Sequence, residues 1–91
     1  MPTYMVLSRL TEKGLKTLKE NPSRIKKVNE ELSSVGEIVA QYALFGRFDF
    51  VTILKVPDVQ TMAKISTEIG ARGSVRLQTY PAFEVDEIME D

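Results

Sequence analysis

The segment EIVAQYALFGRFDFVTILKV, residues 37–56, has the pattern of a β-hairpin. Two runs rich in apolar, β-branched and aromatic residues, 37–45 and 48–56, flank the pair Gly46-Arg47. Such runs joined by two residues that include glycine are typical of adjacent antiparallel strands. The sequence therefore predicts a hairpin in the middle of the chain.

Upstream of the hairpin we expect one strand and a long helical segment. Residues 4–7 (YMVL) are apolar and indicate a strand of about seven residues. Thr11 can cap a helix that begins at Glu12, and apolar residues then recur at helical spacing up to a stop at Gly36. That stripe consists of Leu15, Leu18, Ile25, Val28, Leu32 and Val35. Because Pro22 interrupts the segment, we expect either one kinked helix or two abutting helices.

Downstream of the hairpin we expect a second helix and a last strand. Pro57 ends the preceding strand, Asp58 can cap the helix, and Gly70 and Gly73 close it. The predicted buried stripe of this helix consists of Val59, Met62, Ile65 and Ile69. Residues 74–80 (SVRLQTY) alternate in polarity with period two, which predicts a half-buried strand ended by Pro81.

The resulting order, βαββαβ, predicts an α+β fold of the ferredoxin-like kind. Its four-stranded antiparallel sheet has the strand order 4-1-3-2 and carries two helices on one face. Strands one and three are then central, in agreement with their nearly unbroken apolar character at residues 4–7 and 50–54. We expect a single domain over residues 1–83 and an acidic C-terminal tail over residues 84–91, in which Val85 and Ile88 can dock as a short helical turn.

The composition removes several classes of active site. The 91 residues include 12 Lys and Arg, 13 Asp and Glu, and no His or Cys, for a net charge of −1. Without imidazoles or thiols the chain cannot build a His-based acid/base pair, a thiolate nucleophile, a disulfide or a His/Cys zinc site. No stretch reaches the roughly 18 apolar residues of a membrane span. We therefore expect a cytoplasmic protein with no metal, no cofactor and no membrane contact.

Two helices can cover only one face of a four-stranded sheet. We assign to the helix-covered face Met5, Leu7, Val51, Ile53, Val75 and Leu77, and to the open face Tyr4, Val6, Ser8, Phe48, Phe50, Thr52, Leu54, Arg76, Gln78 and Tyr80. A contiguous apolar patch of this kind marks an interface or a ligand surface. We expect the sheet of a second copy to pack against this face, which makes a dimeric α/β barrel. The sequence does not determine whether more than two subunits assemble. The predicted dimer interface is Tyr4, Val6, Phe48, Phe50, Thr52 and Leu54.

RNA binding is an alternative use of the same face. RNA-recognition motifs share the βαββαβ order and carry exposed aromatic residues on strands one and three. The segment Arg47-Phe48-Asp49-Phe50-Val51 partly matches their strand-three signature, and Tyr4 occupies a stacking position. Asp49, however, replaces a small residue of that signature, and a net charge of −1 does little to neutralise phosphates. Nucleic acid is therefore not the partner that we expect.

Polar residues converge at the hairpin end of the predicted sheet. The predicted ligand-binding residues are Arg9, Arg47, Asp49, Arg72, Arg76, Gln78 and Tyr80. A half-buried carboxylate needs a cation or N–H donors, so we expect an ion pair between Arg9 and Asp49 that locks the hairpin against the first helix. Alternatively, Arg47, Arg72 and the N-terminus of that helix hold a phosphate or carboxylate group.

Three segments of the chain resemble those of a known family. They are MPTYMVLSRLTEKGLKTLKENPSRIKKVNEEL at the start, the hairpin ALFGRFDFVTI, and GARGSVR followed by Pro81-Ala82. Together they resemble the GYD domain family, small bacterial and archaeal proteins largely without assigned function, over nearly the whole chain. The Gly-Tyr-Asp element of that family corresponds to Gly46, Phe48 and Asp49, with Arg47 between them and Phe in place of Tyr. The resemblance implies a dimeric ferredoxin-like α/β barrel and no known reaction.

Three classes of function follow from these patterns, of which RNA binding is the least expected. We favour a homo-oligomeric module for assembly or for binding a small anionic or aromatic ligand. The alternative is a cofactor-independent enzyme that uses Arg76, Tyr80 and Asp49. General acid–base catalysis normally uses a group that titrates near neutrality, and the sequence offers no evident one, so we favour binding over catalysis.

Overall fold

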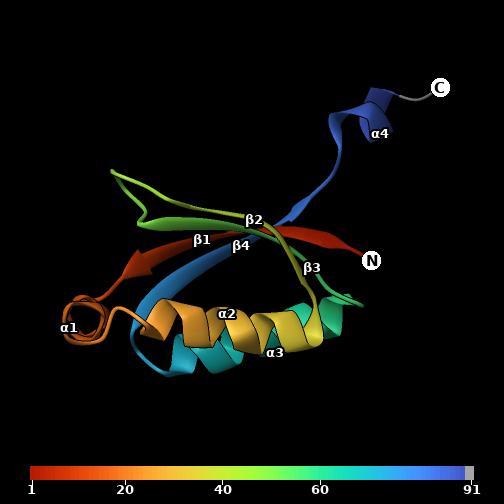
Figure 1. Cartoon of the computed structure of the whole chain (residues 1–91). Coiled ribbons are helices and arrows are strands. Elements are labelled where there is room, and N and C mark those ends of the chain that lie inside the picture. The colour runs from red at the N-terminus through yellow and green to blue at the C-terminus, as the bar shows by residue number, and fades with distance from the viewer. Residues whose placement is uncertain (90–91) are drawn as a thin grey trace.

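The computed structural model, described over residues 1–89, is built on one four-stranded antiparallel sheet (Figure 1). Its strands are β1 (Thr3–Leu10), β2 (Glu37–Ala43), β3 (Phe50–Lys55) and β4 (Val75–Ala82). They lie in the order β2-β3-β1-β4, so β1 and β3 are the central strands. The predicted α+β topology and strand order are confirmed.

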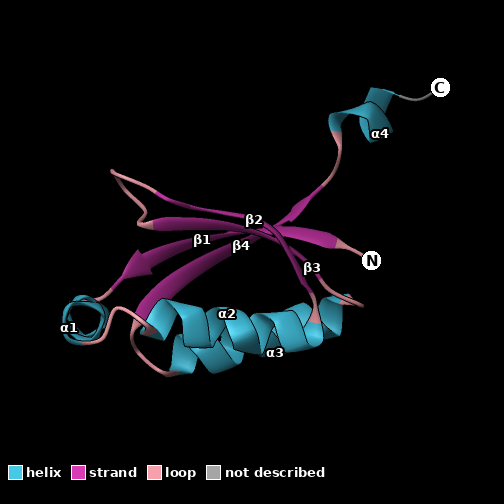
Figure 2. Ribbon diagram, in the orientation of Figure 1, coloured by secondary structure: helices cyan, strands magenta, loops and turns pink. Residues whose placement is uncertain are grey.

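Helices form a layer on one face of this sheet (Figure 2). The long upstream segment is divided into α1 (Glu12–Glu20) and α2 (Arg24–Val35), with Pro22 in the break between them. The downstream helix is α3 (Val59–Ala71). None of the helices within residues 1–89 has the length and apolar character needed to cross a membrane.

Side-chain caps begin α1 and α3 as the sequence predicts. The Thr11 hydroxyl accepts a hydrogen bond from the Gly14 N–H at 3.1 Å, and Asp58 accepts one from the Thr61 N–H at 2.7 Å. Each cap satisfies an N–H group that the first turn of a helix leaves free.

The predicted apolar stripes are only partly buried. Leu32, Met62 and Ile65 belong to the core, whereas Leu15 is 55% exposed. The break at residues 21–23 gives α1 its own orientation, so a single stripe does not continue through both helices. The stripe residues Val35 and Val59 are also exposed, because they end α2 and begin α3.

The hairpin connection is longer than the predicted two-residue turn. Residues 44–49 separate β2 from β3, and Gly46 adopts a positive φ of 143°. The connection is held by three bonds: the Asp49 N–H donates to the Ser8 carbonyl, the Leu44 N–H donates to the Asp49 carbonyl, and the Asp49 carboxylate accepts from the Leu10 N–H. Because Asp49 bonds to the end of β1, regular pairing of β2 with β3 stops before it.

β4 continues through Pro81, where the sequence predicts its end. β4 is an edge strand, and proline is tolerated there because its missing N–H need not serve a ladder on the solvent side. The chain then extends away from the sheet to a short helix, α4 (Val85–Met89), whose Val85 and Ile88 are exposed (Figure 1). The predicted docking of these two side chains is therefore wrong for the described chain. The tail residues 90 and 91 lie outside the described residues, and the boundary at residue 83 stays a prediction.

The faces of β1 and β3 are the reverse of the prediction. Tyr4, Val6, Thr52 and Leu54 lie under the helices and are between 1% and 8% exposed. Cross-strand register agrees, because Tyr4 pairs with Leu54 and Val6 with Thr52. Met5, Leu7, Val51 and Ile53 consequently lie on the open face. A shift of one residue exchanges the faces of a strand, and both faces of these two strands are apolar, so their pattern fits either assignment.

The predicted dimer interface is corrected accordingly. Tyr4, Val6, Thr52 and Leu54 belong to the buried core, and Phe50 lines the space between sheet and helices. Phe48 differs, because the irregular residues before β3 turn it toward the open face, where it lies with Met5 and Leu7. The assignment of β4 is correct: Leu77 packs on the core, while Arg76, Gln78 and Tyr80 point to the open side.

Candidate functional site

The open face of the sheet is apolar at its centre. Met5 and Leu7 of β1 pair in register with Ile53 and Val51 of β3, and all four side chains are only half-buried. Within residues 1–89, the helix layer lies on the opposite side (Figure 2). Aliphatic side chains on the two central strands are thus left without cover by the described chain.

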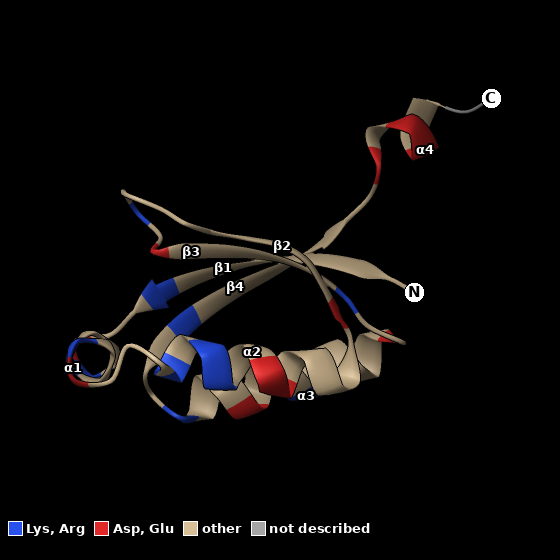
Figure 3. Cartoon of the chain, viewed as in Figure 1, with Lys and Arg blue, Asp and Glu red and all other residues tan. Residues whose placement is uncertain are grey.

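One end of this face is basic. A hollow lies there between β1, β4 and the connection 44–49, and we call it the arginine hollow; it is lined by Met5, Leu7, Arg9, Arg47, Phe48, Arg76, Leu77, Gln78 and Tyr80. Figure 3 shows the basic residues of β1 and β4 at this end of the sheet. Arg9 and Arg76 are direct partners across β1 and β4, and like charges placed opposite each other repel. Because the lining contains no carboxylate, the hollow favours an anionic group.

Five of the seven predicted ligand-binding residues come together in this hollow. They are Arg9, Arg47, Arg76, Gln78 and Tyr80. Tyr80 donates its hydroxyl hydrogen to the Gln78 side-chain carbonyl at 2.7 Å, which fixes both groups beside the arginines. That these residues bind a ligand remains a prediction, but their proximity is a feature of the structure.

Asp49 does not join them. Its carboxylate accepts a hydrogen bond from the Leu10 N–H at 2.7 Å, and no salt bridge to Arg9 is formed within residues 1–89. The side chain of Arg9 lies on the open face opposite Arg76, away from this contact. The predicted Arg9–Asp49 ion pair is therefore wrong, although the carboxylate does find the N–H donor that a half-buried acid needs.

Arg72 lies on the helix side and is already paired. Its guanidinium donates two hydrogen bonds to the Glu31 carboxylate, one of them at 3.1 Å. The hydrogen bond from Arg72 lowers the pKa of Glu31, and the partner carboxylate raises the pKa of Arg72. Arg72 and Arg47 consequently do not form the predicted anion-binding corner with the helix N-terminus. The Thr11 hydroxyl occupies that terminus, where it also donates to the Gly73 carbonyl at 2.7 Å.

The aromatic rings that the RNA alternative places on strands one and three, Tyr4 and Phe50, do not lie on the open face. Tyr4, the predicted stacking residue of strand one, is buried against the helices. Phe50 faces the same inner side. An RNA-recognition motif stacks bases on exposed rings of its two central strands, so the structure does not support this alternative.

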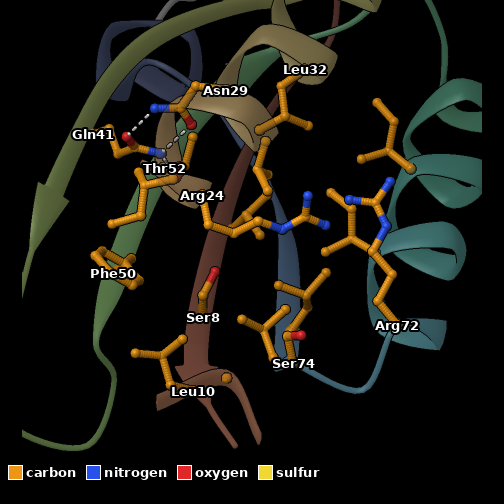
Figure 4. Close-up of a pocket in the computed structure, with 18 of the residues that line it drawn as sticks. Ser8, Leu10, Arg24, Asn29, Leu32, Gln41, Phe50, Thr52, Arg72 and Ser74 are labelled. Atoms are coloured by element: carbon orange, nitrogen blue, oxygen red, sulfur yellow. Dashed lines mark hydrogen bonds between the residues drawn. The ribbon is translucent and has the colours of Figure 1, made fainter. Parts of the chain in front are cut away.

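A cavity on the helix side contains residues that the sequence analysis does not single out. It has a volume of about 140 Å³ and lies between the sheet and α1, α2 and α3. Part of its wall is a half-buried polar network: Asn29 and Gln41 exchange side-chain hydrogen bonds of 2.8 and 3.0 Å, and Gln41 also donates to Thr52 at 3.0 Å (Figure 4). Arg24 enters the same cavity. No sequence motif predicts this cavity, because Arg24 is only one of several basic residues in a segment that is expected to face solvent.

Comparison with known proteins identifies the family of this chain. The family model of the GYD domain matches residues 4–90, nearly the whole length. The chain belongs to the GYD domain family. A Thermus thermophilus member, named glutamine synthetase and cystathionine beta-lyase binding protein, is 44% identical over 91 residues, which cover 98% of this GYD chain and 96% of that protein.

Two solved structures share the fold. The crystal structure of a Thermus thermophilus protein superposes with a TM-score of 0.60 at 23% identity, over 93% of this chain and 96% of that one. An AsnC family transcriptional regulator from Agrobacterium tumefaciens gives a TM-score of 0.60 at 21% identity, over 91% of this chain and 50% of the regulator. At these identities the likeness concerns the fold alone, and it supports the ferredoxin-like topology.

Proposed function

We propose that this GYD-domain chain is a non-catalytic binding module that associates with a second copy through the open face of its sheet. The observation that carries the proposal is the uncovered apolar centre of that face, formed by Met5, Leu7, Val51 and Ile53. Strands that are apolar on both faces are typical of sheets covered on both faces. A second sheet packed at the usual distance of about 10 Å supplies the missing cover and closes a two-chain barrel.

The same chain also binds a partner enzyme in this proposal. The Thermus thermophilus relative is named for its binding of glutamine synthetase and cystathionine beta-lyase. By extension, the partner of this chain is an enzyme of one of these two kinds. The arginine hollow, which lies at the end of the open face, supplies a basic contact for an acidic surface on that enzyme.

Catalysis receives less support than binding. The enzymatic alternative uses Arg76, Tyr80 and Asp49, of which only two line the same hollow. Arg76 and Tyr80 line the arginine hollow, while the Asp49 carboxylate is bonded to the Leu10 N–H. A general base must lie within hydrogen-bond reach of the proton that it abstracts, and the carboxylate of the three is absent from the lining of the hollow.

Self-association is tested by replacing Ile53 with Glu. A carboxylate at the centre of a covered face would lose its hydration without gaining a partner, so Ile53→Glu should convert the wild-type dimer into a monomer. Native mass spectrometry and light scattering at micromolar protein report the change. The matched control is Val59→Glu, an equally sized charge introduced at an exposed position of α3, which should leave the dimer intact. A monomeric wild-type chain, or a dimeric and folded Ile53→Glu variant, would overturn the proposal.

A further inference from the structure

We propose that the cavity on the helix side binds a small organic carboxylate whose apolar part is about the size of a benzene ring. This goes beyond the proposed function, because self-association uses the opposite face of the sheet. The site is formed by residues of all four strands and of the three helices that cover them. Charge, polar groups and volume each restrict its ligand.

The charge comes from Arg24, the first residue of α2. Its guanidinium lies inside the cavity and points toward Arg72 (Figure 4). Glu31 is bonded to Arg72, and the charge of Arg24 also contributes to lowering the pKa of Glu31. Within residues 1–89, however, Arg24 forms no salt bridge and no side-chain hydrogen bond of its own. The lining contains no Asp or Glu. A half-buried guanidinium that faces a second one, in largely apolar surroundings, favours an anion that it can hold with two parallel N–H bonds.

Two serine hydroxyl groups line the same cavity. Ser8 of β1 directs its hydroxyl into the cavity toward Arg24, and Ser74 lies on the neighbouring wall (Figure 4). Within residues 1–89, none of the side-chain hydrogen bonds involves either hydroxyl. Each can therefore donate to the same anion.

The remaining walls are apolar and limit the size of the ligand. Leu10, Leu32 and Phe50 are among them, together with Ile65 and Leu77. The volume of about 140 Å³ is close to that of an engineered cavity of about 150 Å³ that binds benzene. One free guanidinium suits a monocarboxylate better than a phosphate dianion, and drug-sized ligands need pockets of roughly 300 Å³ or more. An aromatic or branched aliphatic monocarboxylate satisfies all of these conditions.

Benzoate is the probe for the first test, with benzyl alcohol as its neutral analogue. Titration of the full-length ¹⁵N-labelled protein followed by NMR should shift the amide signals of Ser8, Leu10 and Ser74 with benzoate. Arg24→Gln should weaken benzoate binding at least tenfold, since a charge-assisted bond contributes about that factor. Lys27→Gln, an exposed lysine one turn away on α2, is the matched control and should change the affinity by less than about twofold. Benzyl alcohol should bind wild type and Arg24→Gln alike.

A second variant blocks the cavity and leaves the charge in place. Ser8→Leu adds an apolar side chain inside the cavity and should abolish benzoate binding, with circular dichroism confirming that it folds. The proposal is overturned by the absence of shifts at millimolar benzoate, by equal losses in Lys27→Gln and Arg24→Gln, or by shifts confined to the open face. Ile53→Glu should retain benzoate binding, and Arg24→Gln should retain self-association. Failure of this site is thus separable from failure of the dimer.

Discussion

Arg72 and Glu31 illustrate how one residue contact can redirect a predicted role. The sequence marks Arg72 as a surplus cation near the hairpin end, but its guanidinium instead joins the end of α3 to α2 through Glu31. A guanidinium fork matches a carboxylate in geometry, so the pair is a structural contact between helices. No helical spacing links residues 31 and 72, and the contact follows only from how α2 and α3 pack.

The pair predicts a dependence of stability on pH. The hydrogen bond from Arg72 lowers the pKa of Glu31 below its ordinary value of 4.5. When the pKa of a carboxyl group is lower in the folded than in the unfolded protein, its ionised form stabilises the fold at pH values above the unfolded-state pKa. This stabilisation is lost as the pH falls through the folded-state pKa. Glu31→Gln should therefore cost stability at pH 7, by at most about 1 kcal/mol because solvent screens the exposed pair, and little at pH 3.

Urea unfolding at the two pH values measures this difference. Glu30→Gln is the control, because Glu30 is an exposed neighbour on the same helix with no salt bridge among the described residues. Equal stability losses in Glu30→Gln and Glu31→Gln at pH 7 would contradict the assigned role of the pair.

At the scale of elements, the backbone of α1 packs closely against the backbone just before β4. A Cβ atom at Gly14 would lie 1.9 Å from the Ser74 carbonyl oxygen, which itself accepts a hydrogen bond from the Thr11 N–H at 3.0 Å. Gly14 is therefore required where α1 meets the start of β4. A helix propensity scale alone would disfavour glycine at this position.

Two glycine substitutions separate the effect of close backbone packing from that of helix propensity. Gly14→Ala should destabilise the protein by roughly 2 kcal/mol or more, because the backbone must move to admit a methyl group. Gly70→Ala in α3 meets no atom within 4 Å and should stabilise the protein by about 0.5–1 kcal/mol through helix propensity. Thermal and urea unfolding of both variants test the pair of predictions, and a neutral Gly14→Ala would show that α1 can shift away from β4.

The strands show what an apolar pattern does and does not determine. Element order and strand order were predictable because caps, prolines and periodicity act locally. The faces of β1 and β3 were not, since both faces are apolar. The alternation of β4 held the missing information: Tyr80 and Gln78 pair with Met5 and Leu7, so the polar side of β4 identifies the open side of β1. Cross-strand register, rather than the pattern of one strand, fixes the assignment.

For the whole molecule, the candidate site was predictable where it depends on strand positions alone. Arg76, Gln78 and Tyr80 follow from the alternation of β4, and Arg9 from its place at the end of β1. Asp49 and Arg72 were misplaced because their roles depend on an irregular connection and on contacts between helices. The helix-side cavity, which requires three helices and four strands together, had no sequence signal.

The proposed partner enzyme provides a test at this scale. Arg76→Glu reverses a charge in the arginine hollow, and it should weaken binding to glutamine synthetase or cystathionine beta-lyase from the same organism by about tenfold or more. Lys26→Glu, an exposed position of α2, makes the same charge change away from the hollow and should have little effect. Biolayer interferometry at two salt concentrations measures both. Equal losses in the two variants would indicate a response to net charge and would contradict a role for the hollow.

The tyrosine side chains are divided between the two sides of the sheet, and this division affects the intrinsic fluorescence of the protein. The chain contains three Tyr and no Trp, so its intrinsic fluorescence comes from tyrosine alone. Tyr4 is enclosed beneath the helices, while Tyr42 and Tyr80 are exposed. Emission from Tyr4 therefore reports whether the helical layer is closed, and quencher access to the other two reports what lies against the far side of the sheet.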